Sequence, residues 1–427
     1  MIRSVDEAEA YLNSLPFVSS GDFISRLELI KSALNKLGNP QNSIPAIHVA
    51  GTSGKGSTAY YIANLLSKTG CKVGFSVSPH LNKVTERTQV LNKDFSDQQY
   101  CRYFNDFLAE LKVLKLDLSY IEFTVIFTYW VFARLKLDYI VIEVGLGGRL
   151  DPTNTITRHG TLRLITDIGY DHMEILGHTL PEIANEKAGI IHTSDTVVMH
   201  RQSSEIMAVI QKKVKADEAH LEVLENDRLK DSKLVKFQQR NLTLAIRAVN
   251  IVLRRSHKSP LTEKQIKEVQ AIKIPGRFEE LKYKGVDILL DVAHNSQKLK
   301  TLSNSLMDKY HNRNYVLIIA LSSSKVDNIS VGLLSITSSA RYVITTSFSS
   351  EVSEYKKMVD PKVLESLILR LGLKKRFVES IKDPYKALDK AINIANQDNA
   401  LLVITGSFFV VNGLRAMLFY DAKEFHK

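Results

Sequence analysis

Cysteine is scarce in this sequence, and long apolar runs are missing. The 427 residues include only Cys71 and Cys101, and neither lies in the spacing of a metal-binding motif. A disulfide-rich scaffold and a cysteine zinc site are therefore excluded, and two free thiols fit a reducing compartment. The longest apolar stretch, Val125–Phe132, is far shorter than the ~20 residues needed to cross a bilayer. Because Asp6 and Glu9 lie in the first segment, we expect no secretory signal and predict a cytoplasmic protein without a membrane partner.

The charged residues also lack the pattern of a nucleic-acid-binding surface. The chain carries 57 basic and 46 acidic residues, which gives a net charge of +11. Such an excess can serve a nucleic acid, a polyanionic small molecule or only a solvated surface. The lysines are scattered through helical segments, as at Lys212, Lys213 and Lys215, and are not interleaved with aromatic residues. We therefore favour a solvated surface, with an anionic small-molecule substrate second and no nucleic-acid partner.

The sequence does contain a regular alternation of strand and helix patterns. Residues 1–40 have apolar positions at helical spacing, and Gly38, Asn39 and Pro40 end the pattern. Four short runs rich in valine and isoleucine follow, namely AIHVAG, KVGFSVS, DYIVIEVG and LRLITDIG. Uniformly apolar runs of this length are typical of parallel strands that are buried on both faces. The pattern predicts an α/β protein with a parallel sheet covered by helices.

The same alternation starts again after residue 275. Four further apolar runs occur there, namely VDILLDVAHN, YVLIIALSS, RYVITTSFS and ALLVITGSF. Pro275 and Gly276 favour a linker, and a chain of this length is expected to hold two or three domains. We therefore predict two domains, at residues 1–275 and 276–427, with a ligand cleft between them.

A glycine-rich loop connects the first predicted strand to a helix. In AIHVAGTSGKGSTAYYIANLL, the strand, the loop, Lys55 and the helix occur in the order typical of a phosphate-binding loop. Backbone N–H groups at a helix N-terminus bind anions, and the lysine can reach the β- and γ-phosphates. The standard spacing is not met, because Val49 replaces a glycine and Gly56 replaces the Ser or Thr after the lysine. Ser57 or Thr58 would then face a magnesium ion, and the alternative is a loop without a ligand.

Polar residues also follow the other predicted strands of this domain. Ser78 follows one strand, Glu143 ends another and His172 follows a third. Because the carboxyl ends of parallel strands share one edge of a sheet, we expect these residues to converge. A buried carboxylate needs a partner, which is either a magnesium ion or a set of structural hydrogen bonds. Lys187 precedes the apolar residues AGII, where few neighbours would keep an ammonium group solvated.

The second domain carries a smaller set of polar residues at a strand end. Asp291 ends a strand, His294 and Asn295 follow it, and Arg277 lies in the linker. An arginine at a domain junction can bind a phosphate across the cleft. An interdomain salt bridge is an equally good explanation of Arg277 from spacing alone.

Taken in order, these motifs resemble those of one enzyme family. The motifs are HVAGTSGKGS, SPHL followed by TER, EVGLGGRLDPTN, DHMEILGHTLPEIANEKAGI, PGRF and DVAHN. The set resembles the folylpolyglutamate synthase/dihydrofolate synthase family, relatives of the Mur ligases, and it extends from Leu37 to Gly406. The resemblance implies a P-loop-type parallel-sheet ATPase domain followed by a smaller Rossmann-like glutamate-ligase domain. It also implies an ATP-dependent amide ligase that phosphorylates a folate or pteroate carboxylate and then joins glutamate to it.

The resemblance further implies roles for individual residues. It implies ATP contacts, with a catalytic lysine among them, at Thr52, Ser53, Gly54, Lys55, Gly56, Ser57, Asn241, Arg277 and Asp291. It implies two Mg²⁺ sites, with ligands at Ser78, Glu143, His172 and Lys187. Of these residues, His172 and Lys187 are also expected to be catalytic, and Lys187 to be carbamylated. It implies substrate contacts at Ser119, Tyr120, Ile121, Glu122, Leu150, Asp151, Pro152, His294 and Ser407. The expected ligands are ATP, Mg²⁺, a monovalent cation, folate or dihydropteroate, and L-glutamate, bound by a monomer.

Three other classes of protein were weighed against this interpretation. A Mur-type ligase acting on a non-folate carboxylate would normally have a domain before the glycine loop, and only about 45 residues precede it here. A GTPase-like switch would carry Asn-Lys-x-Asp, which the Asn-Lys pairs at Asn35, Asn82 and Asn92 lack. A basic nucleic-acid-binding protein would lose affinity steeply as salt is added, and the scattered lysines do not favour it.

Overall fold

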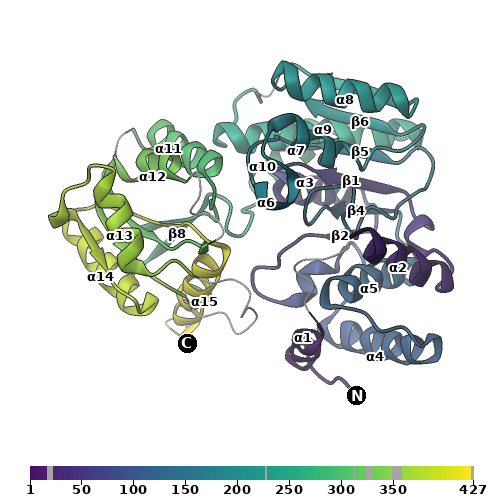
Figure 1. Ribbon diagram of the computed structural model, residues 1–427, viewed down its shortest axis with the longest axis horizontal. Coiled ribbons are helices and arrows are strands. Elements are labelled where there is room, and N and C mark those ends of the chain that lie inside the picture. The colour runs from purple at the N-terminus through teal and green to yellow at the C-terminus, as the bar shows by residue number, and fades with distance from the viewer. Residues whose placement is uncertain (17–22, 227, 312, 324–328, 349–357, 425–427) are drawn as a thin grey trace. The chain divides into compact units, whose positions relative to one another are not determined.

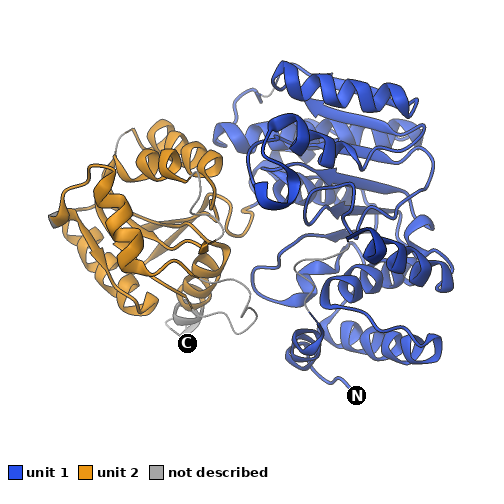
Figure 2. Ribbon diagram, viewed as in Figure 1, with its two compact units in different colours: residues 1–272 blue, residues 273–427 orange. Residues whose placement is uncertain are grey.

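Two compact units divide the chain. The computed structural model describes residues 1–16, 23–226, 228–311, 313–323, 329–348 and 358–424 (Figure 1). The units span Met1–Ile272 and Lys273–Lys427 (Figure 2), so their boundary lies close to the Pro275–Gly276 linker on which the predicted domains were divided. Each unit is built on its own mostly parallel sheet, which confirms the predicted α/β class.

The sheet of the first unit has seven strands within the described residues, in the order β3-β2-β4-β1-β5-β6-β7. All its neighbouring pairs are parallel except β2 and β3. The strands are β1 (Ala46–Ala50), β2 (Val73–Ser76), β3 (Gln89–Leu91), β4 (Tyr139–Glu143), β5 (Leu162–Ile165), β6 (Thr196–His200) and β7 (His220–Leu224). The four predicted runs form β1, β2, β4 and β5. Their carboxyl ends therefore lie along one edge of the sheet, as the sequence predicted.

Helices cover both faces of this sheet. They are α1 (Val5–Ser14), α2 (Phe23–Lys36), α3 (Lys55–Lys68), α4 (Asp97–Leu114), α5 (Tyr120–Leu135), α6 (Met173–Leu176), α7 (Leu180–Ala188), α8 (Ser204–Ala216), α9 (Lys236–Arg255) and α10 (Glu263–Gln270), with 3-10 turns at Pro40–Asn42 and Val84–Arg87. Helix α3 packs against α9 and contacts β1, β2 and β4. Helices α1, α2, α4 and α5 bury one apolar cluster that includes Ala46, and α7 and α8 bury a second that includes Ala50. Because side chains two residues apart in a strand point to the same face, both clusters lie on one side of β1.

Helix α5 is the most apolar helix of the first cluster. Its residues Phe123, Phe127 and Trp130 pack with one another and with Phe104 and Phe107 of α4, at ring-centroid distances between 5.0 and 6.5 Å. A helix that is apolar on all sides belongs inside a protein core. None of the helices in the described ranges is long and apolar enough to span a membrane.

The second unit has a six-stranded sheet in its described part, in the order β12-β11-β10-β13-β9-β8, with only β8 antiparallel to its neighbour. The strands are β8 (Glu279–Tyr283), β9 (Val286–Leu290), β10 (Tyr315–Ile319), β11 (Ala340–Thr345), β12 (Val378–Ser380) and β13 (Leu401–Thr405). The helices are α11 (Ser296–Tyr310), α12 (Ser330–Thr337), α13 (Pro361–Arg370), α14 (Pro384–Gln397) and α15 (Phe408–Glu424), with a 3-10 turn at Lys375–Phe377. The predicted runs form β9, β10, β11 and β13.

Candidate active site

The glycine loop joins β1 to the first turn of α3. Gly54 precedes the helix with φ = +92°, a conformation that a residue with a Cβ rarely adopts. The first bond of the helix runs from the N–H of Thr58 to the carbonyl of Gly54. The N–H groups of the preceding residues therefore have no partner within the helix, and they point out of its N-terminus together with the positive end of its dipole. This arrangement suits an anion such as a phosphate.

The loop after β5 holds the glycine loop in place, a role that the sequence pattern alone does not reveal. The carbonyl of Asp167 accepts hydrogen bonds from the N–H groups of Thr52 (2.8 Å) and Ser53 (3.0 Å). The hydroxyl of Thr52 donates to the carbonyl of Gly169 at 3.0 Å. The Asp167 carboxylate is paired with Arg240 of α9 at 2.8 Å. The strand-end pattern TDIG marked this position in the sequence, but only the fold shows which loop it contacts.

Two lysines that are far apart in the sequence meet at one backbone oxygen. The ammonium of Lys55 donates to the carbonyl of Gly51 at 3.1 Å, and that of Lys187 donates to the same oxygen at 3.0 Å. Lys187 is buried, with 3% of its surface exposed. Two ammonium groups at one neutral oxygen would repel each other, so the arrangement favours either a nearby anion or a neutral amine on the buried Lys187. The structure thus brings together two residues that were predicted to be catalytic.

Glu143 lies at the end of β4, next to the first turn of α3. A Cβ on Gly56 would lie only 3.1 Å from the Glu143 carboxylate, so glycine permits this close approach. The carboxylate accepts a hydrogen bond from the backbone N–H of Ser78 at 2.9 Å. Ser78 and Glu143, two of the predicted magnesium ligands, are therefore neighbours beside the glycine loop.

Asp151 is a second buried carboxylate near this point. A Cβ on Gly145 would lie 3.3 Å from its Oδ2 and 3.6 Å from the Ser78 hydroxyl. Its two oxygens accept hydrogen bonds from the N–H groups of Leu146 (2.7 Å) and Thr153 (2.9 Å). Burial raises the pKa of Asp151, an effect that these hydrogen bonds and the charge of Lys55 oppose. Leu150 and Pro152, the other predicted residues of this segment, flank Asp151 in the loop after β4.

His172 lies beside two acidic side chains of its own segment. It precedes α6 with φ = +50°, and its ring lies 3.5 Å from the carboxylate of Glu174 and 3.9 Å from that of Asp171. In the described part of the chain, no three His, Cys, Asp or Glu side chains are grouped closely enough to hold a metal ion. Of the four predicted metal ligands, only Glu143 and His172 belong to those residue types.

The predicted substrate segment Ser119–Glu122 forms the start of α5. The Glu122 carboxylate accepts from the N–H and hydroxyl of Ser119, both at 2.8 Å, and pairs with Arg26 at 2.6 Å. These contacts cap the helix, a structural role that was not predicted for this segment. Ile121 is half-buried against the apolar cluster of α1, α2, α4 and α5.

Tyr120 is linked to the loop that contains Ser78. The guanidinium of Arg87 lies over the Tyr120 ring, 5.4 Å from its centroid, and donates to His80 at 3.0 Å. Since His80 lies two residues after Ser78, the start of α5 and the Ser78 loop are adjacent.

In the second unit, the predicted residues gather at the carboxyl ends of β9 and β13. Asp291 accepts hydrogen bonds from the N–H groups of Phe278 (2.8 Å) and Ala293 (2.9 Å). Burial raises the pKa of Asp291, and the nearby Arg277 is the largest effect that opposes the increase. The guanidinium of Arg277 also lies 5.7 Å from the ring centroid of Phe408.

His294 and Ser407 belong to the same edge of the second sheet. Lysine is only a donor, so the 3.1 Å contact from Lys298 makes Nε2 of His294 an acceptor. Its Nδ1 then carries the proton and donates to the carbonyl of Val292 at 2.7 Å. Ser407 is buried directly after β13, and its hydroxyl accepts from the N–H of Phe409 at 3.2 Å.

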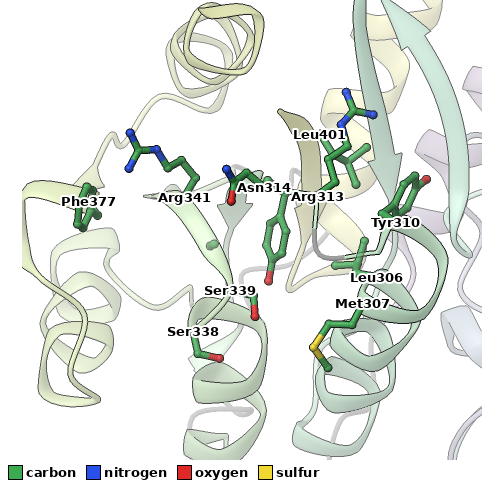
Figure 3. Close-up of a pocket in the computed structure, with 12 residues that line it drawn as sticks. Leu306, Met307, Tyr310, Arg313, Asn314, Ser338, Ser339, Arg341, Phe377 and Leu401 are labelled. Atoms are coloured by element: carbon green, nitrogen blue, oxygen red, sulfur yellow. The ribbon is translucent and has the colours of Figure 1, made fainter. Parts of the chain in front are cut away.

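A cavity of about 420 Å³ lies at the opposite end of the second sheet (Figure 3). It is lined by residues at the amino ends of β10, β11 and β13, including Tyr315, Arg341 and Leu401. Ligands of open α/β sheets bind outside the carboxyl ends of the strands. This cavity is therefore separate from the edge that holds Asp291, His294 and Ser407.

Comparisons with known proteins agree with the motifs and the fold. Residues 270–417 match the family model described as dihydrofolate synthetase, C-terminal domain. The chain is 29% identical over 414 residues to dihydrofolate synthetase of Saccharomyces cerevisiae, which covers 91% of this chain and 96% of that protein. It is 27% identical over 421 residues to dihydrofolate synthase/folylpolyglutamate synthase of Bacillus subtilis, which covers 91% and 94%.

Solved structures extend the likeness over almost the whole chain. The crystal structure of folylpolyglutamate synthase from Thermotoga maritima is similar with a TM-score of 0.77 and 28% identity, covering 97% of this chain and 96% of that one. A folylpolyglutamate synthase complex with AMPPCP and folate is similar with a TM-score of 0.76 and 26% identity, covering 97% and 99%. The two units and the glycine loop define an α/β protein of the Mur-ligase-like class. Within that class, the family model, the relatives and the solved structures all support the folylpolyglutamate synthase/dihydrofolate synthase family for this chain.

Proposed function

We propose that this chain is an ATP-dependent ligase that joins L-glutamate to the carboxylate of a pteroate or folate. A carboxylate oxygen of the acceptor attacks the γ-phosphorus of ATP, and ADP leaves. The amino group of glutamate then attacks the acyl carbon, an amide bond forms, and inorganic phosphate leaves. The observation that carries the proposal is the meeting of Lys55 and Lys187 at the carbonyl of Gly51, beside the N-terminus of α3.

The first unit is proposed to bind and align the triphosphate. Within the segment Thr52–Ser57, the N–H groups from Gly54 onward and the ammonium of Lys55 suit the phosphate oxygens, because they place positive charge where the transferred group carries negative charge. The N–H groups of Thr52 and Ser53 instead donate to the carbonyl of Asp167 and hold the segment in place. Asn241 is close to the same loop, since a Cβ on Gly54 would lie 2.3 Å from its side-chain oxygen. This chemistry needs charge and alignment, and it needs no covalent nucleophile from the protein.

The residues at the ends of β2 and β4 fit a magnesium site. Magnesium prefers oxygen ligands, and Ser78 and Glu143 offer a hydroxyl and a buried carboxylate against the first turn of α3. We assign Ser78 and Glu143 to one Mg²⁺, and His172 with the carbamate of Lys187 to a second. Bound magnesium would neutralise phosphate charge. The burial of Lys187 supports the carbamate, because a poorly solvated amine favours a neutral form that can react with carbon dioxide.

The remaining assignments concern the acceptor and glutamate. We assign the segments Ser119–Glu122 and Leu150–Pro152 to the pteroate or folate, and His294 and Ser407 to glutamate. Arg277 and Asp291 are assigned to ATP. On this proposal, residues 1–275 are the ATP-binding domain and residues 276–427 are the glutamate-ligase domain. A monovalent cation, a monomeric state and a cytoplasmic location belong to the same proposal.

A product assay tests the proposed function. The purified chain is incubated with ATP, MgCl₂ and L-glutamate, with dihydropteroate or tetrahydrofolate as the acceptor, and ADP and the conjugate are measured. We expect ADP release to require both an acceptor and glutamate, and each ADP to match one new amide. Release that neither acceptor stimulates would overturn the proposed substrate class and leave a Mur-type ligase for a non-folate carboxylate as the alternative.

A further inference from the structure

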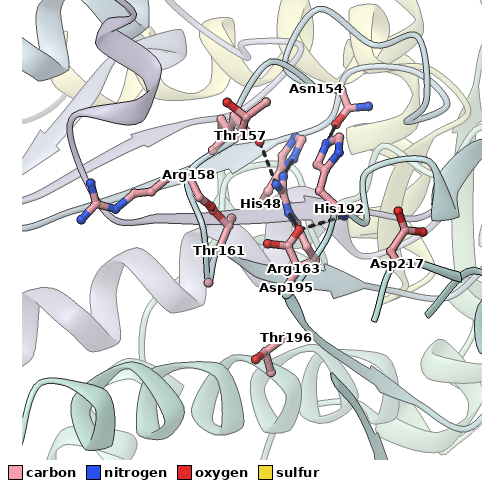
Figure 4. A network of polar contacts seen from close by, with 12 residues as sticks. His48, Asn154, Thr157, Arg158, Thr161, Arg163, His192, Asp195, Thr196 and Asp217 are labelled. Atoms are coloured by element: carbon pink, nitrogen blue, oxygen red, sulfur yellow. Dashed lines mark hydrogen bonds and ion pairs between the residues drawn. The ribbon is translucent and has the colours of Figure 1, made fainter. Parts of the chain in front are cut away.

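A chain of buried polar side chains runs through the sheet of the first unit. Arg163 of β5 pairs with Asp195 at 2.7 Å, and both side chains are at most 1% exposed. The same guanidinium contacts Nδ1 of His48 in β1 at 2.8 Å, and Figure 4 shows these three residues in line. His48 and Arg163 are register partners in the two neighbouring strands. Nε2 of His48 in turn lies 2.9 Å from the hydroxyl of Thr153.

The direction of these hydrogen bonds is fixed by chemistry. Arginine is only a donor, so Nδ1 of His48 must accept, and its proton must be on Nε2. Nε2 then donates to the Thr153 hydroxyl, which is left to donate its own proton to Oδ1 of Asp151. Burial and the charge of Arg163 both lower the pKa of His48, which keeps the ring neutral as this pattern requires.

Asp151 is the residue at which this row of hydrogen-bonded side chains reaches the candidate active site. Its Oδ1 receives the Thr153 hydroxyl and N–H, and its Oδ2 receives the N–H of Leu146. Every one of these bonds requires Asp151 to act as an acceptor, and the charge of Lys55 also favours the ionised form. The buried pair of Arg163 and Asp195 could stabilise the core without Thr153. The hydroxyl of Thr153, however, donates its proton to Asp151, which is a residue of the candidate site.

We propose that His48 and Thr153 are positioning residues that hold Asp151 as an ionised, oriented acceptor for the pteroate or folate substrate. This inference rests on the proposed function, in which Asp151 belongs to the acceptor-binding segment. His48 and Thr153 act through Asp151 and need no contact with the substrate. Their loss weakens the binding of the acceptor, while the glycine loop and its phosphate contacts stay intact.

The test compares Thr153→Val with Thr153→Ser in the steady-state assay of ADP release. Valine keeps the shape of threonine and removes the hydroxyl, whereas serine keeps it. We expect Thr153→Val to raise the KM for the acceptor about tenfold, since a hydrogen bond to a charged group is lost, and to leave the KM for ATP within about twofold. Thr153→Ser should keep both values within about twofold of the parent. Thr161→Val is the control, because that buried hydroxyl donates only to the carbonyl of Arg158.

A second pair of variants tests the direction of the hydrogen bonds at His48. Glutamine can accept from Arg163 with its oxygen and donate to Thr153 with its nitrogen, so His48→Gln should keep the acceptor KM within about threefold. His48→Leu should raise that KM at least as much as Thr153→Val. An acceptor KM for Thr153→Val equal to that of the parent, or equal increases in the KM values for the acceptor and for ATP, would overturn the inference. A parent enzyme that releases no ADP with any acceptor would instead overturn the proposed function.

Discussion

The two units contain the same strand–loop–helix junction with opposite chemistry. In the first unit, β1 leads through the glycine loop into α3, whose N-terminus is preceded by Gly54 and has no side-chain cap. In the second unit, β9 leads into α11, whose N-terminus is capped by the side chain of Asn295, which accepts from the N–H of Lys298 at 2.9 Å. The first junction leaves its N–H groups for an anion, and the second uses them within the protein.

The central strands of the two sheets also differ in the polar side chains that they bury. The central strands β10 and β13 of the second sheet are fully buried and carry apolar side chains apart from Tyr315 and Thr405. The sheet of the first unit buries His48 and Arg163 in two adjacent strands. Buried polar groups are costly unless they are all bonded, so a sheet retains them only where a defined geometry is needed. The comparison therefore favours the first unit, at the edge to which its chain of polar side chains leads, as the place of the proposed phosphate transfer.

Replacement of Lys55 by alanine is expected to have the largest effect on this comparison. Without that ammonium group, the phosphates lose the one side chain of the loop that carries positive charge, and ADP release should fall on the order of 10⁴-fold, about 5.5 kcal/mol. Lys68→Ala is the matched control, because Lys68 lies in the last turn of the same helix and pairs with Glu268 on the surface. Activity of Lys55→Ala within a few-fold of the parent would contradict the phosphate role of the loop.

The sequence predicted the junctions far better than it predicted the contacts across them. The uniformly apolar runs located eight strands, including all those that carry the candidate site residues. The apolar pattern did not locate the short or partly exposed edge strands β3, β7, β8 and β12, because their mixed composition hides it. The buried strand β6 was also missed. The roles of Asp167 and His48 could not be predicted, because each depends on which residue the fold places opposite it. His48 lies within an apolar run, and only the register of β1 with β5 pairs it with Arg163.

Replacement of Asp195 by asparagine sharpens the contrast between the two sheets. It leaves the buried Arg163 without a charged partner and should lower the free energy of unfolding of the first unit by about 3–5 kcal/mol. Trp130, the single tryptophan of the chain, is buried in this unit, so its fluorescence during urea unfolding reports on the first unit alone. Asp398→Asn is the control in the second unit, whose unfolding is followed by far-ultraviolet circular dichroism; its 3.3 Å pair with Arg341 is exposed and should contribute about 0.5 kcal/mol or less. An equal, small change for both variants would mean that the buried pair is not needed for stability.

The smallest expected effect concerns the cap of α11, and it tests whether the two helix N-termini differ as described. Asn295→Ala removes the cap and should lower the free energy of unfolding of the second unit by about 1 kcal/mol, whereas Asn295→Gly should cost only a few tenths of a kcal/mol. The loss should appear in far-ultraviolet circular dichroism during urea unfolding and not in the fluorescence of Trp130. The glycine variant recreates in α11 the uncapped N-terminus of α3, but Lys298, the lysine of its first turn, donates to His294. It should therefore gain no ATP affinity, because the proposed phosphate site of the first unit also needs a lysine directed at the glycine loop. A second ATP site that appears in Asn295→Gly and is absent from the parent would show that the absence of a cap is sufficient, and that the position of the lysine is not what separates the two junctions.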